Sequence, residues 1–115
     1  MIEATIIDYL TTKLDGIPVF LEMPEERPDE FVLIERTGGA NQDRGAINSA
    51  MIAIQSWSGS LYGAASLNDL VKAAMLEIPN EANDVCECSL NSDYNFTDTT
   101  KKAYRYQAVY NITHY

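Results

Sequence analysis

Apolar residues recur at regular intervals along the chain and predict its secondary structure. Within residues 1–14 they return every three to four positions, which places them on one side of a helix. Asp15 and Gly16 follow and are typical of a helix end. The residues of this first apolar stripe are Ile2, Ile6, Tyr9, Leu10 and Leu14.

A second helix is predicted over residues 60–78. Ser58 or Ser60 can cap its first turn, and Pro79 is expected to end it. Small side chains keep this helix slim, so that it can approach a sheet or a neighbouring subunit closely. These are Ala64, Ala65, Ala73 and Ala74, and the apolar stripe comprises Leu67, Val71, Ala74, Met75 and Ile78.

Five segments have the alternation and composition of strands, namely residues 17–22, 31–37, 48–57, 84–96 and 102–115. Pro18 suits an edge position for the first of them. The third is the predicted central strand, because neither of its faces is fully polar. The order helix, three strands, helix, two strands predicts one α+β domain over residues 1–115. We expect a mostly antiparallel sheet with both helices packed on it.

The connection over residues 37–47, TGGANQDRGAI, is long, polar and rich in glycine, although two residues suffice to turn a hairpin. A phosphate-binding loop is disfavoured. No Gly-Lys-Ser/Thr sequence closes the segment, and glycines at positions 38, 39 and 45 do not fit a dinucleotide fingerprint. A contact arm for a partner protein and a plain surface loop both remain open.

The charge balance limits the partners that the chain can bind. Its 115 residues include 17 acidic and 8 basic side chains, for a formal charge of −9. Binders of DNA or anionic membranes depend on basic patches, so this balance disfavours both, although DNA can pass such a protein without sticking. No apolar run approaches the ~18 residues of a membrane span, and no signal-peptide pattern opens the chain. We expect a protein that stays in the cytoplasm.

Few side chains suggest catalysis or metal binding. Cys86 and Cys88 fall short of the roughly four ligands of a structural zinc site and are interpreted as buried apolar thiols. His114, the sole histidine, is interpreted as a loose polar side chain near the chain end. Acidic pairs lie in predicted loops or at strand ends, where solvated carboxylates lack the split pKa values of acid–base catalysts. We therefore expect no enzyme, metal or cofactor.

A row of tyrosines lies on the last predicted strand, where Tyr104, Tyr106 and Tyr110 share one face. Such a row can stack on nucleic-acid bases or pack across strands beneath a helix. The acidic balance favours packing.

Two stretches carry a resemblance to a known family. One is AIQSWSGSLYGAASLNDLVKAAM, residues 53–75, a strand that runs through serines into an alanine-rich helix. The other is LNSDYNFTDTTKKAYRYQAVYNITHY, residues 90–115, a polar strand, a Thr/Lys turn and a tyrosine-rich strand. Together with the short acidic chain they resemble the tail-terminator proteins of long-tailed phages and prophages of Gram-positive bacteria. These are also called tail-completion or head–tail joining proteins and are sometimes grouped with minor capsid proteins.

The resemblance implies a virion protein of the tail or neck, assembled in the host cytoplasm, that forms a six-fold ring on the last ring of the tail tube. Such a ring stops tube polymerisation and offers a surface to the head connector. The implied partners are further copies of the chain, the tail-tube protein and the connector or stopper protein. DNA passes through the lumen without specific binding, and neither a membrane nor a cofactor is involved.

The resemblance also directs attention to two subunit contacts, the 37–47 connection and the 60–78 helix. An adaptor or stopper ring of the same neck is the alternative function, followed by a small ligand-binding domain or enzyme. The candidate subunit or ring contacts are Gly38, Gly39, Asn41, Gln42, Asp43, Arg44, Gly45, Ser60, Tyr62 and Ala64.

Overall fold

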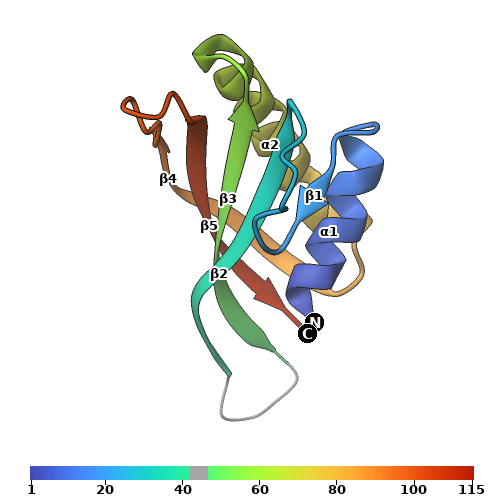
Figure 1. Cartoon of the computed structure of the whole chain (residues 1–115). Coiled ribbons are helices and arrows are strands. Elements are labelled where there is room, and N and C mark those ends of the chain that lie inside the picture. Colours follow the sequence, from blue (N-terminus) through green and yellow to red (C-terminus); the bar gives the residue numbers. More distant parts are fainter. Residues whose placement is uncertain (42–46) are drawn as a thin grey trace.

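The computed structural model describes residues 1–41 and 47–115, which form an α+β domain with two helices and a five-stranded sheet (Figure 1). The predicted element order, α-β-β-β-α-β-β, is confirmed. In chain order the elements are α1 (Ile2–Lys13), β1 (Val19–Phe20), β2 (Phe31–Asn41), β3 (Asn48–Ser58), α2 (Leu61–Glu81), β4 (Val85–Asn95) and β5 (Tyr104–His114).

The sheet has the strand order β1-β2-β3-β5-β4, so β3 is central as predicted and β4 forms one edge. Only β1 runs parallel to its neighbour, and the three other pairs are antiparallel. The strand predicted over residues 17–22 is reduced to two residues at the opposite edge. Pro18 lies just before it and accepts a hydrogen bond from the Val32 backbone N–H through its carbonyl oxygen, at 2.9 Å. The predicted edge position of this strand is confirmed.

Both helices cover one face of the sheet (Figure 1). The predicted stripe of α1 supplies Ile2, Ile6 and Leu10 to the core, because their spacing turns them toward the strands. From the sheet, alternate residues point the same way, as expected from the two-residue period of a strand. The main members from the other elements are Val32, Ile34, Ala50, Ile52, Ile54, Leu67, Val71, Met75, Ile78, Ala108, Tyr110 and Ile112.

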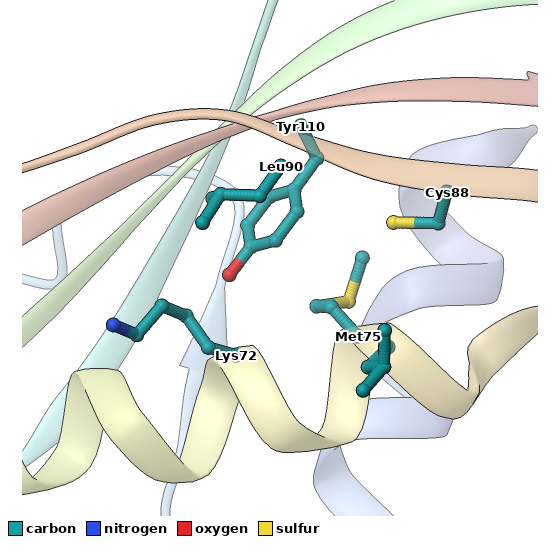
Figure 2. Close-up of a pocket in the computed structure, with 6 residues that line it drawn as sticks. Lys72, Met75, Cys88, Leu90 and Tyr110 are labelled. Atoms are coloured by element: carbon teal, nitrogen blue, oxygen red, sulfur yellow. The ribbon is translucent and has the colours of Figure 1, made fainter.

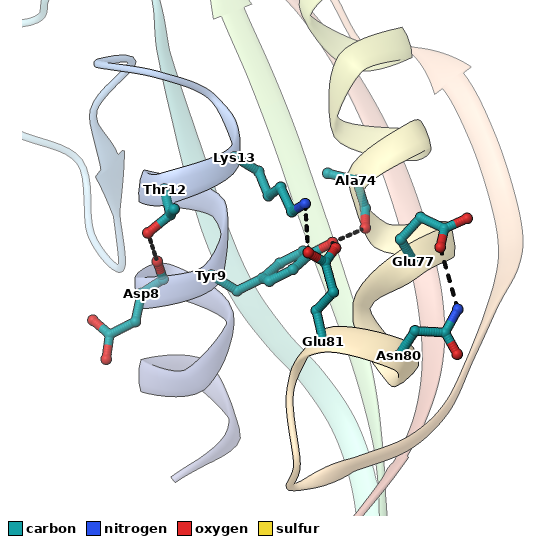
Figure 3. Close-up of polar contacts among 8 residues, drawn as sticks. All are labelled: Asp8, Tyr9, Thr12, Lys13, Ala74, Glu77, Asn80 and Glu81. Carbon is teal, nitrogen blue, oxygen red and sulfur yellow. Dashed lines mark hydrogen bonds and ion pairs between the residues drawn. The ribbon is translucent and has the colours of Figure 1, made fainter.

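Polar contacts also join the two helices (Figure 3). The Tyr9 hydroxyl donates to the Ala74 carbonyl oxygen at 2.6 Å and lies 3.1 Å from Glu81 Oε2. Glu81 also pairs with Lys13, at 2.6 Å, and this contact lowers the pKa of the Glu81 carboxyl. Burial and the neighbouring Glu81 raise the pKa of Tyr9 well above its usual value, so its hydroxyl keeps the proton that it donates.

Helix α2 extends past the predicted stop. Pro79 was expected to end it, but the helix continues to Glu81 with Pro79 inside. A proline removes the backbone bond to the residue four positions earlier, which here is Met75. The bond at the end of the helix is present, since the N–H of the C-cap residue Ala82 donates to the Ile78 carbonyl oxygen at 2.9 Å. One missing bond in the last turn is tolerated because that turn is held by packing of Ile78 in the core.

Strand β2 also runs further than predicted. The sequence predicts a strand that ends at Thr37, whereas Gly38 to Asn41 continue it and pair with residues 51 to 48 of β3. A register shift between Arg36 and Gly38 precedes this part of the ladder. The β2–β3 hairpin therefore projects as a paired ribbon beyond the helix-covered part of the sheet (Figure 1).

The two chain ends lie next to each other beside Asp84 (Figure 1). The Tyr115 backbone N–H donates to the Asp84 carbonyl oxygen at 2.9 Å, and the Thr5 hydroxyl donates to the Asp84 carboxylate at 2.7 Å. His114 was predicted to be loose, but it is buried and pairs with both neighbouring strands, at Asn48 and Val85. The ladder around β5 orders the chain end up to this residue.

Candidate interaction surface on helix α2

The three candidate contacts on α2 have different environments. Ser60, one of the two serines predicted as possible caps, is the N-cap, and its hydroxyl accepts from the Gly63 N–H at 3.0 Å. Tyr62 follows with 85% of its surface exposed. Ala64 is fully buried, so its side chain is not accessible to a partner in the single subunit. Within this group Tyr62 is available to a partner, and Ser60 fixes the turn that carries it.

The candidates on the β2–β3 hairpin divide between strand and undescribed residues. Gly38 and Gly39 lie in β2 opposite Met51 and Ala50, and the backbone of Asn41 pairs with that of Asn48. Gly39 has φ +152°, and a Cβ added there would lie 2.5 Å from the Ser49 carbonyl oxygen. This glycine is therefore required by the close approach of two backbones. Gln42, Asp43, Arg44 and Gly45 lie outside the described residues.

The outward side of α2 carries large apolar side chains in water. Besides Tyr62, Leu70 is 55% exposed and Leu76 is 72% exposed, and Leu90 of β4 adds a further exposed leucine. Leu70 and Leu76 are not at the positions of the helix that face the core. Their positions in the sequence could therefore have indicated apolar side chains on the outward side of the helix. Tyr62 and Leu76 are about 21 Å apart along the helix axis, so these are separate exposed apolar positions, each of which could contact another molecule. We call Tyr62, Leu70, Leu76 and Leu90 the α2 outer surface.

A pocket of about 220 Å³ opens between α2 and β4 (Figure 2). Leu76 and Leu90 belong both to this pocket and to the α2 outer surface. The side chains that line it are Lys72, Met75, Leu76, Cys88, Leu90 and Tyr110. We call it the α2–β4 pocket. The predicted packing of the tyrosine row beneath a helix is confirmed for Tyr110, which is buried in the core at this position.

Charge at the rim of the pocket is balanced locally. Lys72 Nζ lies 2.6 Å from Asp93 Oδ2 and 3.4 Å from Asp69 Oδ1, and the hydrogen bond with Asp93 raises the pKa of Lys72. Burial opposes ionisation of Asp93, but hydrogen bonds from Lys72 and Asn68 outweigh it and keep the pKa of Asp93 below its usual value. The lysine at the rim is thus already neutralised by side chains of its own chain.

Aromatic and basic side chains gather at one end of the helix-free face of the sheet. Trp57 stacks on Phe31 with ring centroids 5.3 Å apart. The guanidinium groups of Arg27 and Arg105 lie 5.2 and 4.7 Å from the centroid of the Trp57 ring, within the range of cation–π attraction. A shallow pocket of about 190 Å³ adjoins this cluster and includes Lys102. Two arginines thus contact one indole ring in a protein whose formal charge is −9.

The remaining candidates for chemistry are dispersed. Cys86 and Cys88 are free thiols and half-buried, so the prediction of buried thiols was too strong. Cys88 packs against the core, and burial raises the pKa of its thiol to about 11. Within residues 1–41 and 47–115, no three His, Cys, Asp or Glu side chains gather where they could hold a metal ion. None of the helices in this part of the chain is long and apolar enough to cross a membrane.

Comparison with known proteins adds no family assignment. No protein-family model matches the chain, and no curated protein is significantly similar to it.

Proposed function

We propose that this chain is a structural subunit of a phage virion. It caps the tail tube as a ring, stops tail polymerisation and joins the tail to the head connector. The observation that carries the proposal is the α2 outer surface, where Tyr62, Leu70 and Leu76 stand exposed on a helix whose other side is buried in the core. This surface supports a self-assembling role, and the sequence resemblance supplies the identity of the assembly.

The physical basis is the behaviour of apolar residues at protein interfaces. Burying one large apolar side chain yields roughly 1.5–3 kcal/mol, and aromatic residues are common binding hot spots. Tyr62 and Leu76 are more than two-thirds exposed, so each retains most of this free energy for a partner. In a ring, every subunit contributes the same surface once per boundary. Contacts that are weak between two free subunits then add their binding free energies once a tube end holds several copies side by side.

Two other features are compatible with this role. The β2–β3 hairpin projects from the body of a molecule measuring 47 × 26 × 25 Å and gives the subunit an arm beyond its core. The acidic balance suits a ring through which DNA passes, because carboxylates around a lumen repel phosphates. Localisation in the virion neck and contact with the tail-tube protein are part of the proposal.

The test is removal of the gene from the phage or prophage that encodes it, followed by electron microscopy of the particles. We expect overlong or unjoined tails, restored by the wild-type chain supplied in trans. Leu76→Asp, which places a charge on the α2 outer surface, should fail to restore them, whereas Asn80→Asp on the same helix should succeed. Normal particles without the protein would refute the proposal, as would a virion reconstruction that shows single copies outside any ring.

The hairpin provides a second test. Since Asn41 pairs with Asn48, residues 42–47 can be replaced by Asn-Gly without interrupting the described ladder. Loop shortening changes closure entropy by little, so the variant should fold. Fewer joined particles would support an arm, and normal infectious titre would show that the segment serves only as a turn. Arg44→Glu should weaken assembly in a salt-dependent manner if this residue meets a carboxylate, since a rim pair contributes about 0.2–1 kcal/mol.

The alternative function, an adaptor or stopper ring of the same neck, would use the same type of surface. The two functions can be distinguished by the protein to which the chain binds. A terminator binds the tail-tube protein, whereas a stopper binds the connector in the absence of tail-tube protein. Pull-down of the purified chain with each candidate partner distinguishes the two.

A further inference from the structure

We propose that the shallow pocket beside Trp57 binds carboxylate groups of an acidic segment in a partner protein. Arg27 and Lys102 line this pocket, which has a volume of about 190 Å³, and Arg105 contacts the same indole ring. We call it the Trp57 pocket. Three observations carry the proposal: these cations lack ion pairs, strand pairing gathers them, and one guanidinium is held with its outer nitrogens free. The proposal goes beyond the virion role and does not depend on it.

The cations at the Trp57 pocket have no counter-charge within the described part of the chain. Lys13 and Lys72 each pair with a carboxylate. Among residues 1–41 and 47–115, in contrast, Arg27, Lys102 and Arg105 form no ion pair. Like charges that are brought together repel one another, and an anion that binds between them removes this cost. The complementary ligand is therefore an anion, although the chain as a whole is acidic.

Strand pairing gathers these charges at one end of the sheet (Figure 1). Phe31 of β2 lies opposite Trp57 of β3, and Trp57 lies opposite Arg105 of β5. Lys102 belongs to the turn just before β5. Asp98 stabilises this turn by accepting hydrogen bonds from two backbone N–H groups, at 3.1 and 3.3 Å, so its carboxylate already has partners. Segments distant in sequence thus present their cations to one ligand.

Arg105 is held in a position that leaves its outer nitrogens free. Its guanidinium lies 4.7 Å from the centroid of the Trp57 ring and 4.5 Å from that of Phe96. Its Nε donates to the Phe96 carbonyl oxygen at 2.8 Å, and its two Nη atoms have no hydrogen-bond partner among the described residues. A planar carboxylate can accept two parallel hydrogen bonds from such a fork. Little ordering is required on binding, because the side chain is already held.

The surroundings favour a short acidic segment of a protein over nucleic acid. Asp29 lines the pocket, and Glu26 and Glu30 are exposed in the same connection before β2. These carboxylates repel a ligand that carries a phosphate at every nucleotide. The rings are also closed to base stacking, since Trp57 is 5% exposed and Phe31 is 2% exposed. The matching ligand therefore has a few carboxylates among uncharged residues, which a polypeptide can supply.

Peptide titration tests the site directly. The peptide Gly-Glu-Ser-Glu-Gly, with both ends capped, is titrated into the full chain at low salt. Binding is followed by calorimetry and by the fluorescence of Trp57, the sole tryptophan. We expect saturable binding that weakens as the salt concentration rises. The uncharged peptide Gly-Gln-Ser-Gln-Gly and a short oligothymidylate are the controls, and both should bind at least about tenfold more weakly.

Arginine variants locate the binding. Arg105→Gln should weaken binding of the glutamate peptide about tenfold, and Arg105→Lys, which keeps the charge and loses the fork, about threefold. Arg27→Gln changes an exposed side chain, so it should fold normally and weaken binding about threefold. Arg36→Gln is the matched control, because Arg36 is also exposed but neither lines the pocket nor contacts Trp57. It should remain within about twofold of wild type. Thermal melts verify that each variant is folded.

Three results would each overturn the proposal. The first is the absence of saturable binding of the glutamate peptide at millimolar concentrations. The second is an equal loss of binding from Arg36→Gln and Arg27→Gln, which would indicate attraction to positive charge in general. The third is an oligothymidylate that binds as tightly as the glutamate peptide, which would assign the pocket to nucleic acid. None of these results bears on the virion role, which is tested by particle morphology.

Discussion

Gln55→Leu should destabilise the fold by about 2 kcal/mol, because Gln55 is the centre of a hydrogen-bond chain across three strands. Its Oε1 accepts from Trp57 Nε1 at 3.0 Å, and its Nε2 donates to Gln107 Oε1 at 2.9 Å. Gln107 in turn donates to the hydroxyl of Tyr94. The chain links β3, β5 and β4 on the face that carries no helix.

The magnitude follows from what each partner loses. Leucine is similar in size to glutamine, so packing changes little. Trp57 is 5% exposed, and leaving its N–H unpaired costs about 1–3 kcal/mol. Gln107 is half-buried, so water can replace its lost partner and the cost there is about 0–1 kcal/mol. Their sum is a large part of a typical stability of roughly 5–15 kcal/mol.

Urea unfolding measures the effect, followed by far-UV circular dichroism and by the fluorescence of Trp57, the sole tryptophan. A double-mutant cycle isolates the bond. In a Trp57→Phe background no indole N–H is present, so Gln55→Leu should cost about 1 kcal/mol less there. Asn111→Leu, an exposed change on the same face, is the control and should remain within about 0.5 kcal/mol of wild type. Equal losses from Gln55→Leu in both backgrounds would refute this account of the hydrogen-bond chain.

Three further predictions concern other parts of the molecule. Replacing Cys86 and Cys88 by alanine should lower stability by about 1 kcal/mol and leave tail joining intact; zinc that copurifies with the wild type and is lost with the thiols would contradict this. The lowered pKa of Asp93 means that its ion pair stabilises the fold above the unfolded pKa of about 3.9 and ceases to do so as pH falls through the folded value. Thermal melts below about pH 5 should therefore show a smaller acid-induced loss for Asp93→Asn than for wild type, and equal losses would exclude the pair as the cause. Gly39→Ala should weaken the outer hairpin by about 1–3 kcal/mol because of its positive φ and the nearby Ser49 carbonyl, whereas Gly38→Ala meets only Met51 Cβ at 3.8 Å and should be nearly neutral. Hydrogen exchange at residues 48–51 distinguishes the two.

The order of the elements was predictable because each has its own apolar period. The stripe of α1 and the alternation of β3 depend on neighbouring residues in the chain, and both were recognised correctly. Element ends were less predictable. Pro79 remains inside α2 because packing of Ile78 outweighs one missing backbone bond, and no local pattern reports such a balance.

The pocket and the hydrogen-bond chain could not be predicted, because both depend on registers between strands distant in sequence. Cys88 and Leu90 reach Tyr110 and its neighbours through the β4–β5 ladder, which contains two register shifts. Gln55 meets Gln107 because the two are paired across β3 and β5. Tyr62 was recognised as a candidate contact, whereas the exposed Leu70 and Leu76 were not, although they lie off the core-facing stripe.

The two chain ends meet beside Asp84. The order of the elements along the chain could therefore be changed by circular permutation while their arrangement in space is kept. A short linker from Tyr115 to Met1 would bridge neighbouring points, and a new opening in the exposed turn at Thr99 and Thr100 would leave every described strand and helix whole. Such a circular permutant carries its ends beside Phe96 and Arg105 instead of beside Asp84. A label fused at either pair of ends then views the assembled particle from a different side. The distance between the two labels in electron micrographs would give the orientation of the subunit within its ring.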